Sequence, residues 1–224
     1  MGNPTDKISS IRLSLVRMPL AQPISDAKVL TGVQKPLTEV ALVFCELKTA
    51  DGAEGMGFSY SKRAGGDGIY AHAREIASNL LGEDPNDIQR LWTKLCWAGA
   101  SVGRSGLTVQ AIAPFDVALW DLKARRAGLS LAKLLGAQRD SIRLYNTSGG
   151  FLSTPLEQVL ENMDASLASG IGGIKIKVGH PDLKQDLTRV AAVRKKLPEH
   201  VALMGDANQQ WDRPGAIRAC RALE

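Results

Sequence analysis

Two lysines separated by one residue, Lys175 and Lys177, form the pattern whose chemistry is easiest to interpret. They end an apolar stretch, Gly172 to Val178, that predicts a β-strand. Side chains alternate faces along a strand, so both lysines point to one face while Ile176 points to the other. Repulsion between two ammonium groups, together with partial burial, lowers a lysine pKa, and this is how a lysine becomes a general base near neutral pH. A pair of surface lysines at an exposed strand end is the alternative interpretation.

A carboxylate and an amide follow the next predicted strand along the chain. Asp206 and Asn208 stand at the C-terminal end of a strand predicted over residues 201–206. Barrel and doubly wound enzymes place their sites at this edge. Asp206 therefore suits a hard cation, and Asn208 suits a substrate oxygen. A lone carboxylate is a weak metal signal, so capping of the following helix is the alternative interpretation.

The elements that must position these residues begin with an α+β part, expected to form one domain over residues 1–140. Strands are predicted over residues 8–17, 38–49 and 55–60, and Asp51-Gly52 predicts the hairpin turn between the last two. Helices are predicted over residues 71–81, 87–98 and 107–127, the last ending at Gly128. These elements predict an antiparallel meander covered by helices.

The second part, residues 141–224, alternates strands with helices. Strands are predicted over residues 142–148, 172–178 and 201–206, and helices begin at the capping box 154–157, at Asp182 and at Asp212. This alternation indicates three parallel βα units. A complete barrel of such units needs about 250 residues, and far fewer follow the first domain, so a closed barrel is not expected from these residues alone.

Composition narrows the class of protein. The chain has 224 residues, 28 Lys and Arg against 23 Asp and Glu, and a net charge of +5. Three separated cysteines, Cys45, Cys96 and Cys220, predict buried thiols in a reducing cytoplasm rather than disulfides or a zinc site. Residues 1–7 lack the core of a signal peptide, Asp6 excludes a myristoylation motif, and no apolar run suits a membrane span. Positive charge suits a polyanion, but no nucleic-acid motif accompanies it, so we expect neither a nucleic-acid nor a membrane partner.

Several sequence strings resemble one enzyme group. GGIKIKVGHP, GDANQQW and PFDVALWDLKARRAG are similar to the mandelate racemase and muconate lactonizing subgroup of the enolase superfamily. The strings SDAKVLTG, GFSYSKRAGG, NLLGEDPNDI, WAGASVGRSG and YNTSGGF narrow the resemblance to its acid-sugar dehydratases. The resemblance implies an α+β capping domain followed by the first three βα units of a modified TIM (β/α) barrel, truncated.

The resemblance also implies roles for individual residues. Lys177 would be the base that removes the proton α to the substrate carboxylate, and Lys175 would bind that carboxylate and lower the pKa of its neighbour. Asp206 would be the first Mg²⁺ ligand, with Asn208 as a substrate contact beside it. The residues expected to close over the distal part of a hexarate lie in two polar loops, 22–35 and 61–68: Asp26, Lys28, Lys62 and Arg63. A cationic lid also suits a dicarboxylate on physical grounds, although ordinary solvated loops are the alternative.

The implied reaction is the Mg²⁺-dependent dehydration of a dicarboxylate acid sugar, galactarate or L-talarate. It proceeds through an enediolate and gives a 3-deoxy-2-keto-hexarate. Further acidic metal ligands and a second acid/base of the family would come from strands beyond this chain, so the chain alone is expected to lack part of the site. A homo-oligomer is expected at full length. Two alternatives remain, namely a racemase or cycloisomerase on the same scaffold and a non-catalytic basic binding protein.

Overall fold

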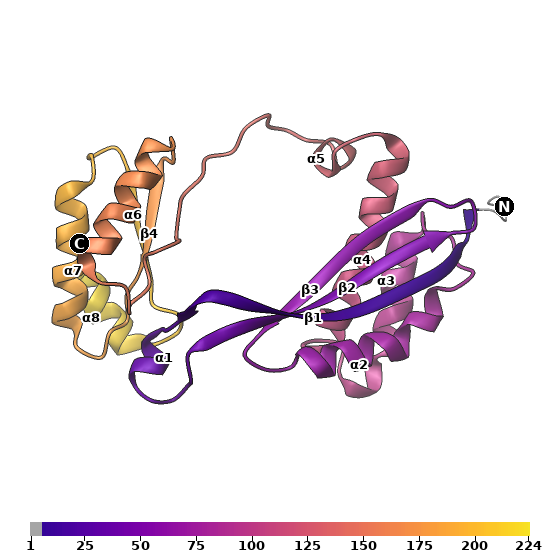
Figure 1. The fold of residues 1–224 in the computed structure, drawn as a ribbon, viewed down its shortest axis with the longest axis horizontal. Coiled ribbons are helices and arrows are strands. Elements are labelled where there is room, and N and C mark those ends of the chain that lie inside the picture. The colour runs from indigo at the N-terminus through magenta and orange to yellow at the C-terminus, as the bar shows by residue number, and fades with distance from the viewer. Residues whose placement is uncertain (1–5) are drawn as a thin grey trace. The chain divides into compact units, whose positions relative to one another are not determined.

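The computed structural model describes residues 6–224, which divide into two compact units (Figure 1). One unit comprises the residues up to Ala21 and Glu39–Gln138, and the other comprises Gln22–Thr38 and Arg139–Glu224. We call them the sheet unit and the site unit. The expectations about a signal peptide and a lipid anchor concern residues 1–7, of which residues 1–5 lie outside the described part. Among residues 6–224, no helix has the length and apolar character needed to span a membrane.

A three-stranded sheet forms one layer of the sheet unit. Its strands are β1 (Ile8–Ile24), β2 (Leu37–Thr49) and β3 (Glu54–Lys62), in the order β1-β2-β3. β2 and β3 pair antiparallel, with Phe44 opposite Phe58. Gly52 closes their hairpin at φ 88°, a left-handed value that glycine adopts without a steric penalty. The meander is confirmed, but β1 runs seven residues beyond its predicted end at residue 17, so the first predicted loop is shorter and contains the helical turn α1 (Ala27–Leu30).

Helices cover one face of this sheet (Figure 1). The long ones are α2 (Gly66–Ala77), α3 (Ile88–Ala98) and α4 (Leu107–Ala127), and the short ones are η2 (Ser78–Leu80), η3 (Ala100–Val102) and α5 (Leu131–Leu134). α3 and α4 confirm the predicted ranges, and α4 ends at Gly128 with φ 61°. α2 begins five residues earlier than predicted, so the second polar loop is shorter than expected.

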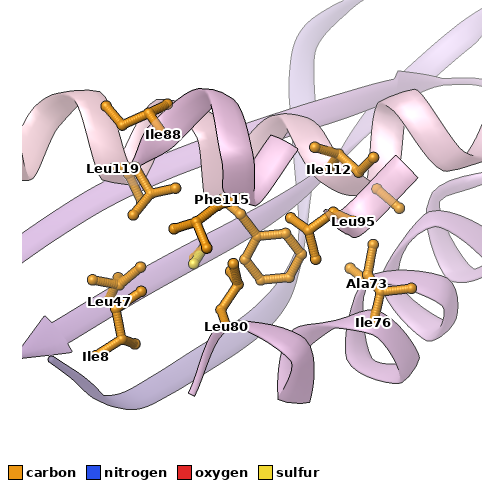
Figure 2. Close-up of a cluster of buried hydrophobic side chains, with 14 of the residues drawn as sticks. Ile8, Leu47, Ala73, Ile76, Leu80, Ile88, Leu95, Ile112, Phe115 and Leu119 are labelled. Atoms are coloured by element: carbon orange, nitrogen blue, oxygen red, sulfur yellow. The ribbon is translucent and has the colours of Figure 1, made fainter. Parts of the chain in front are cut away.

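The core of the sheet unit lies between the sheet and α4. Figure 2 shows the fully buried Phe115 ring of α4 among apolar side chains from the strands and the other helices. α4 approaches β3 closely, because a Cβ built on Gly57 would lie 2.2 Å from the Pro114 carbonyl oxygen. Glycine is therefore required at this contact between helix and strand.

Besides the short α1, the site unit contains two parallel strands and three longer helices. They are α6 (Leu156–Ala168), β4 (Gly173–Lys177), α7 (Leu183–Lys196), β5 (Ala202–Asp206) and α8 (Arg213–Leu223). β4 and β5 pair in parallel, as predicted. Ile174 and Ile176, 5% and 1% exposed, pack with α6 and α7, which confirms that Ile176 points to the face opposite the two lysines.

Three predictions for this unit need correction. The segment predicted as a strand over 142–148 forms only an isolated parallel bridge, Asn146 to Ile174, because its apolar side chains Ile142 and Leu144 remain 78% and 64% exposed and gain nothing from an extended ladder. The expected Thr154 capping box is absent: Pro155 is the N-cap of α6, and the Thr154 carbonyl accepts a hydrogen bond from Arg189 instead.

The third correction concerns the thiols. Cys45 is fully buried and Cys96 is half-buried, but Cys220 is exposed. Its neighbour Ala219 takes the inward position on α8, so Cys220 faces away from the unit. Burial raises the pKa of the Cys45 thiol to about 12.

Candidate active site

Three side chains meet at the C-terminal ends of β4 and β5. The Lys177 Nζ lies 2.8 Å from Asp206 Oδ2, and the Lys175 Nζ lies 3.2 Å from the same oxygen. The three side chains are 17% (Lys177), 24% (Lys175) and 32% (Asp206) exposed. They therefore form a partly buried cluster that a small molecule in solvent can still reach.

The backbone determines this convergence. In the parallel register Lys177 is the partner of Asp206, so their side chains leave adjacent strands at the same level. Lys175 lies on the same face of β4 because it is two residues away. The Lys177 N–H donates to the Gly150 carbonyl at 2.7 Å, and the Lys175 N–H donates to the Asn146 carbonyl at 2.8 Å. The segment before α6 thus supports the free edge of β4.

Charge pairing dominates the electrostatics of the cluster. The hydrogen bond from Lys177, followed by one from the Asn208 backbone N–H, holds the pKa of Asp206 far below its usual range. The hydrogen bond to Asp206 raises the pKa of Lys175. Asp206 lies against both ammonium groups and thereby compensates their mutual repulsion.

Asn208 and Tyr145 border the cluster. Asn208 follows β5 in a left-handed turn at φ 49°, is exposed, and donates its backbone N–H to Asp206 Oδ1 at 2.9 Å. The Tyr145 ring centroid lies 5.6 Å from the Lys175 Nζ, a distance that permits a cation–π interaction. Sequence reasoning gave Tyr145 no role, although its place just before the bridge residue Asn146 puts it beside β4.

Asp206 fits one position of a magnesium site. Its carboxylate is ionised and partly exposed, and carboxylate oxygen is the ligand type that Mg²⁺ prefers. Within residues 6–224, no group of three or more His, Cys, Asp or Glu side chains is arranged to hold a metal ion. Asp206 therefore suits a metal that takes its remaining ligands from water, substrate or other protein groups.

The four residues expected in the lid loops fall in different units. Asp26 and Lys28 belong to the site unit, and the Asp26 carboxylate caps α1 by accepting the Lys28 N–H at 3.0 Å. Lys62 and Arg63 belong to the sheet unit. Lys62 ends β3 with its Nζ 5.7 Å from the centroid of the Tyr60 ring, and the exposed Arg63 adopts φ 72°. Asp26 thus has a local structural role that the sequence did not predict.

Family models match both units. The model described as mandelate racemase / muconate lactonizing enzyme, N-terminal domain, matches residues 13–136, more than half of the chain. A second model, described as enolase C-terminal domain-like, matches residues 158–224, which contain the lysine and aspartate cluster. The chain belongs to the mandelate racemase / muconate lactonizing enzyme family.

Within this family the chain is similar to proteins of stated activity. It is 66% identical, over 98% of its length, to the L-talarate/galactarate dehydratase of Salmonella typhimurium, and covers 55% of that protein. It is 36% identical, over 96% of its length, to the 3,6-anhydro-alpha-L-galactonate cycloisomerase of Streptomyces coelicolor, and covers 58% of it. The chain thus spans little more than half the length of these family members.

A solved structure of a family member has the same fold. The L-talarate dehydratase of Polaromonas sp. JS666, complexed with Mg and L-glucarate, superimposes with a TM-score of 0.93 at 67% identity. The match covers 97% of this chain and 58% of that one. The antiparallel sheet with its helices is therefore the capping domain of the enolase-like fold, and β4 and β5 belong to a partial barrel.

Proposed function

We propose that the intact protein dehydrates a dicarboxylate acid sugar of the galactarate or L-talarate type in the presence of Mg²⁺. The observation that carries the proposal is the convergence of Lys175 and Lys177 on Asp206 at the ends of two parallel strands. The 66% identity to a dehydratase with these substrates supports it. Family membership favours an enzyme over a non-catalytic basic binding protein.

In this proposal Lys177 and Lys175 have different tasks. With its Nζ deprotonated, Lys177 takes the proton from the carbon next to the substrate carboxylate, and the C–H electron pair moves towards that carboxylate. Lys175 holds the carboxylate with its ammonium group, and Asn208 contacts a neighbouring substrate oxygen. The β-hydroxyl then leaves as water, taking its proton from a second acid/base group of the intact protein, and the resulting enol tautomerises to the 3-deoxy-2-keto acid.

A divalent metal at Asp206 supplies positive charge where negative charge develops on the carboxylate. Before that, Asp206 neutralises the two ammonium groups and keeps them at the strand ends. Asp26, Lys28, Lys62 and Arg63 provide a lid over the distal part of the sugar acid, since a second carboxylate needs cationic donors.

The same proposal includes the domain division, the oligomeric state, the location and the partners of the enzyme. Residues 1–140 form the capping domain, and residues 141–224 begin the barrel with three βα units, the first strand being represented by the bridge at Asn146. The protein acts as a homo-oligomer in the cytoplasm, with a small-molecule substrate and neither a nucleic-acid nor a membrane partner.

A cycloisomerase is the second candidate, because a relative with that activity is 36% identical over 96% of the chain. Both reactions begin with proton abstraction next to a carboxylate in this proposal, so the lysine and aspartate cluster serves either. The product separates them: dehydration yields a keto acid and water, whereas cycloisomerisation yields an isomer of unchanged mass.

The deciding experiment uses the intact protein with Mg²⁺ and either galactarate or L-talarate. We expect keto-acid formation, a loss of 18 mass units from the sugar acid, and a decrease in kcat of about 10³-fold in Lys177→Ala, since a positioned base contributes on that order. Lys195→Ala, which removes an exposed lysine of α7, is the matched control and retains activity. A protein that forms keto acid from neither sugar, or a Lys177→Ala variant within about tenfold of the original kcat, contradicts the proposal.

A further inference from the structure

α7 holds both backbone segments that flank the C-terminal end of β4. Asp186, in the first turn of α7, accepts the backbone N–H groups of Gly179 and His180 at 2.7 and 2.9 Å. These two residues lie just after Lys177 in the chain, with only Val178 between. One carboxylate oxygen, Oδ2, therefore fixes the path of the chain as it leaves the strand.

Arg189, one turn further along α7, holds the segment on the other side. Its guanidinium donates to the Thr154 carbonyl at 2.8 Å and to the Phe151 carbonyl. Gly150, next to Phe151, is the residue whose carbonyl accepts the Lys177 N–H. Asp186 and Arg189 thus clamp the chain after Lys177 and the chain beside it.

This arrangement is costly, and that argues for a purpose other than stability. Asp186 is 1% exposed, and its second oxygen, Oδ1, is buried without a hydrogen-bond partner, as is the Arg189 Nε. Burial raises the pKa of Asp186 and lowers the pKa of Arg189. Val193, two turns from Asp186 on the same buried stripe, is fully buried. An apolar side chain like this one would fill the position of Asp186 without the cost of burying a charge.

We propose that Asp186 and Arg189 are positioning residues for Lys177. They do not touch the substrate. They fix the backbone on both sides of the strand end, so that the Lys177 Nζ stays aligned for proton abstraction, where an error of about 1 Å costs on the order of 10²-fold in rate. The statement about rate rests on the proposed function, whereas the statement about the backbone does not.

The first test measures the backbone of the intact protein by hydrogen exchange. In Asp186→Ala, we expect the amides of Gly179 and His180 to exchange at least about tenfold faster, because they lose the carboxylate oxygen that accepts both N–H groups. Asp186→Asn retains an acceptor oxygen and is expected to restore most of the protection. Val193→Ala, which weakens the packing of the same helix without touching either loop, is the control for a general loss of stability and leaves these amides protected.

The second test measures catalysis in the same variants. At a temperature well below every variant's Tm, Asp186→Ala and Arg189→Lys are expected to lower kcat at least about tenfold with KM changed by less than about threefold, because alignment and not substrate binding is lost. Exchange of the substrate α-proton with D₂O decreases in parallel. Asp186→Asn recovers most of kcat, and Val193→Ala keeps kcat even though its Tm decreases.

The two proposals fail in different ways. If the unmodified protein dehydrates neither sugar acid, the proposed function fails, and the exchange experiment still decides whether Asp186 clamps the loop after Lys177. If Asp186→Ala leaves the Gly179 and His180 amides protected, the positioning role is wrong. The same follows if Asp186→Ala and Val193→Ala lower kcat equally for an equal decrease in Tm. If the Asp186→Ala variant does not fold, Arg189→Lys replaces it in both tests. Hydrogen exchange is then measured at the amides of residues 151–154.

Discussion

The sheet unit and the site unit differ in where their carboxylates lie. In the sheet unit the large core around Phe115 is apolar, and the ion pairs, such as Glu83 with Arg90 and Lys94, lie at the rim. In the site unit the apolar cluster is smaller, and α7 buries the carboxylate of Asp186 completely. Among residues 6–224, Asp186 is the only carboxylate buried to this degree.

The two units are therefore stabilised and shaped by different kinds of interaction. The sheet unit gains most of its stability from apolar area. Among residues 6–224, the polar side chains that it buries are Thr49, Ser59, His72 and Thr108, and none of them is a carboxylate. The site unit must hold Lys177 and Asp206 at the ends of short strands. The hydrogen bonds that Asp186 accepts and Arg189 donates have the directionality that apolar contacts lack. Three expected outcomes test this contrast, in order of decreasing effect.

Truncation of the central aromatic ring has the largest expected effect. Phe115→Ala is expected to lower the free energy of unfolding of the sheet unit by about 3–5 kcal/mol, because the ring is 0% exposed and leaves a cavity. Urea titration monitored within this unit measures the loss. Phe58→Ala is the control, since Phe58 is 49% exposed and its loss leaves no cavity. Equal destabilisation by the two variants would show that the core does not lie under α4.

A smaller loss is expected where α4 lies directly on β3. Gly57→Ala places a methyl group 2.2 Å from the Pro114 carbonyl oxygen, so helix and strand must separate, at a cost of about 1–3 kcal/mol. Gly68→Ala is the control, because its nearest atom, on the flexible Leu107 side chain, lies 3.7 Å away. Thermal unfolding of the two variants checks the difference, and an unchanged Tm in Gly57→Ala would contradict the close contact.

The smallest expected effect is a difference in sign between the contributions of two carboxylates, Glu83 in the sheet unit and Asp186 in the site unit, to the pH dependence of stability. Hydrogen bonds from Lys94 and Arg90 lower the pKa of Glu83, so its contribution is present above the unfolded pKa of about 4.3 and is lost as pH falls through the folded value. Burial raises the pKa of Asp186, so the folded protein binds a proton at this carboxylate more tightly than the unfolded chain, and the contribution of Asp186 to stability increases as pH falls towards about 3.9.

Urea midpoints of each unit between about pH 3 and 6 measure these two slopes. Glu83→Gln is expected to reduce the acid sensitivity of the sheet unit by about 0.5–1 kcal/mol, the value of exposed ion pairs. Asp186→Asn removes the opposite contribution, so this variant is expected to lose stability more steeply on acidification than the unmodified site unit. If Glu83→Gln and Asp186→Asn changed the acid sensitivity of their units in the same direction, the contrast between a rim carboxylate and a buried one would be contradicted.

Much of the secondary structure follows from local patterns that the sequence displays. The apolar stripe of α3, the stop at Gly128 and the Asp51-Gly52 hairpin depend on contacts within a few residues, and each is confirmed. The bridge at Asn146 and the start of α6 depend on distant partners, β4 and Arg189, and there the local pattern is insufficient.

The candidate site shows the same division. Residue spacing alone placed Lys175 and Lys177 on one face of a strand and Asp206 at the end of the next, since strand alternation is a property of the chain itself. The sign of the Lys175 pKa shift required the parallel register, because only that register sets Asp206 against both ammonium groups. The charged residue at an inward position of α7, Asp186, was visible in the helical period of Leu183, Val190 and Val193, and only the folded chain shows what it binds.

The sequence by itself determined the order of strands and helices, the residue types at the strand ends and the family resemblance, because these depend on side-chain chemistry and on periods of two and 3.6 residues. Tertiary structure alone decided which carbonyl accepts the Lys177 N–H, which groups compensate its charge and which helix clamps its loops. These contacts join residues far apart in the chain, and their energies depend on burial and distance, which the fold creates.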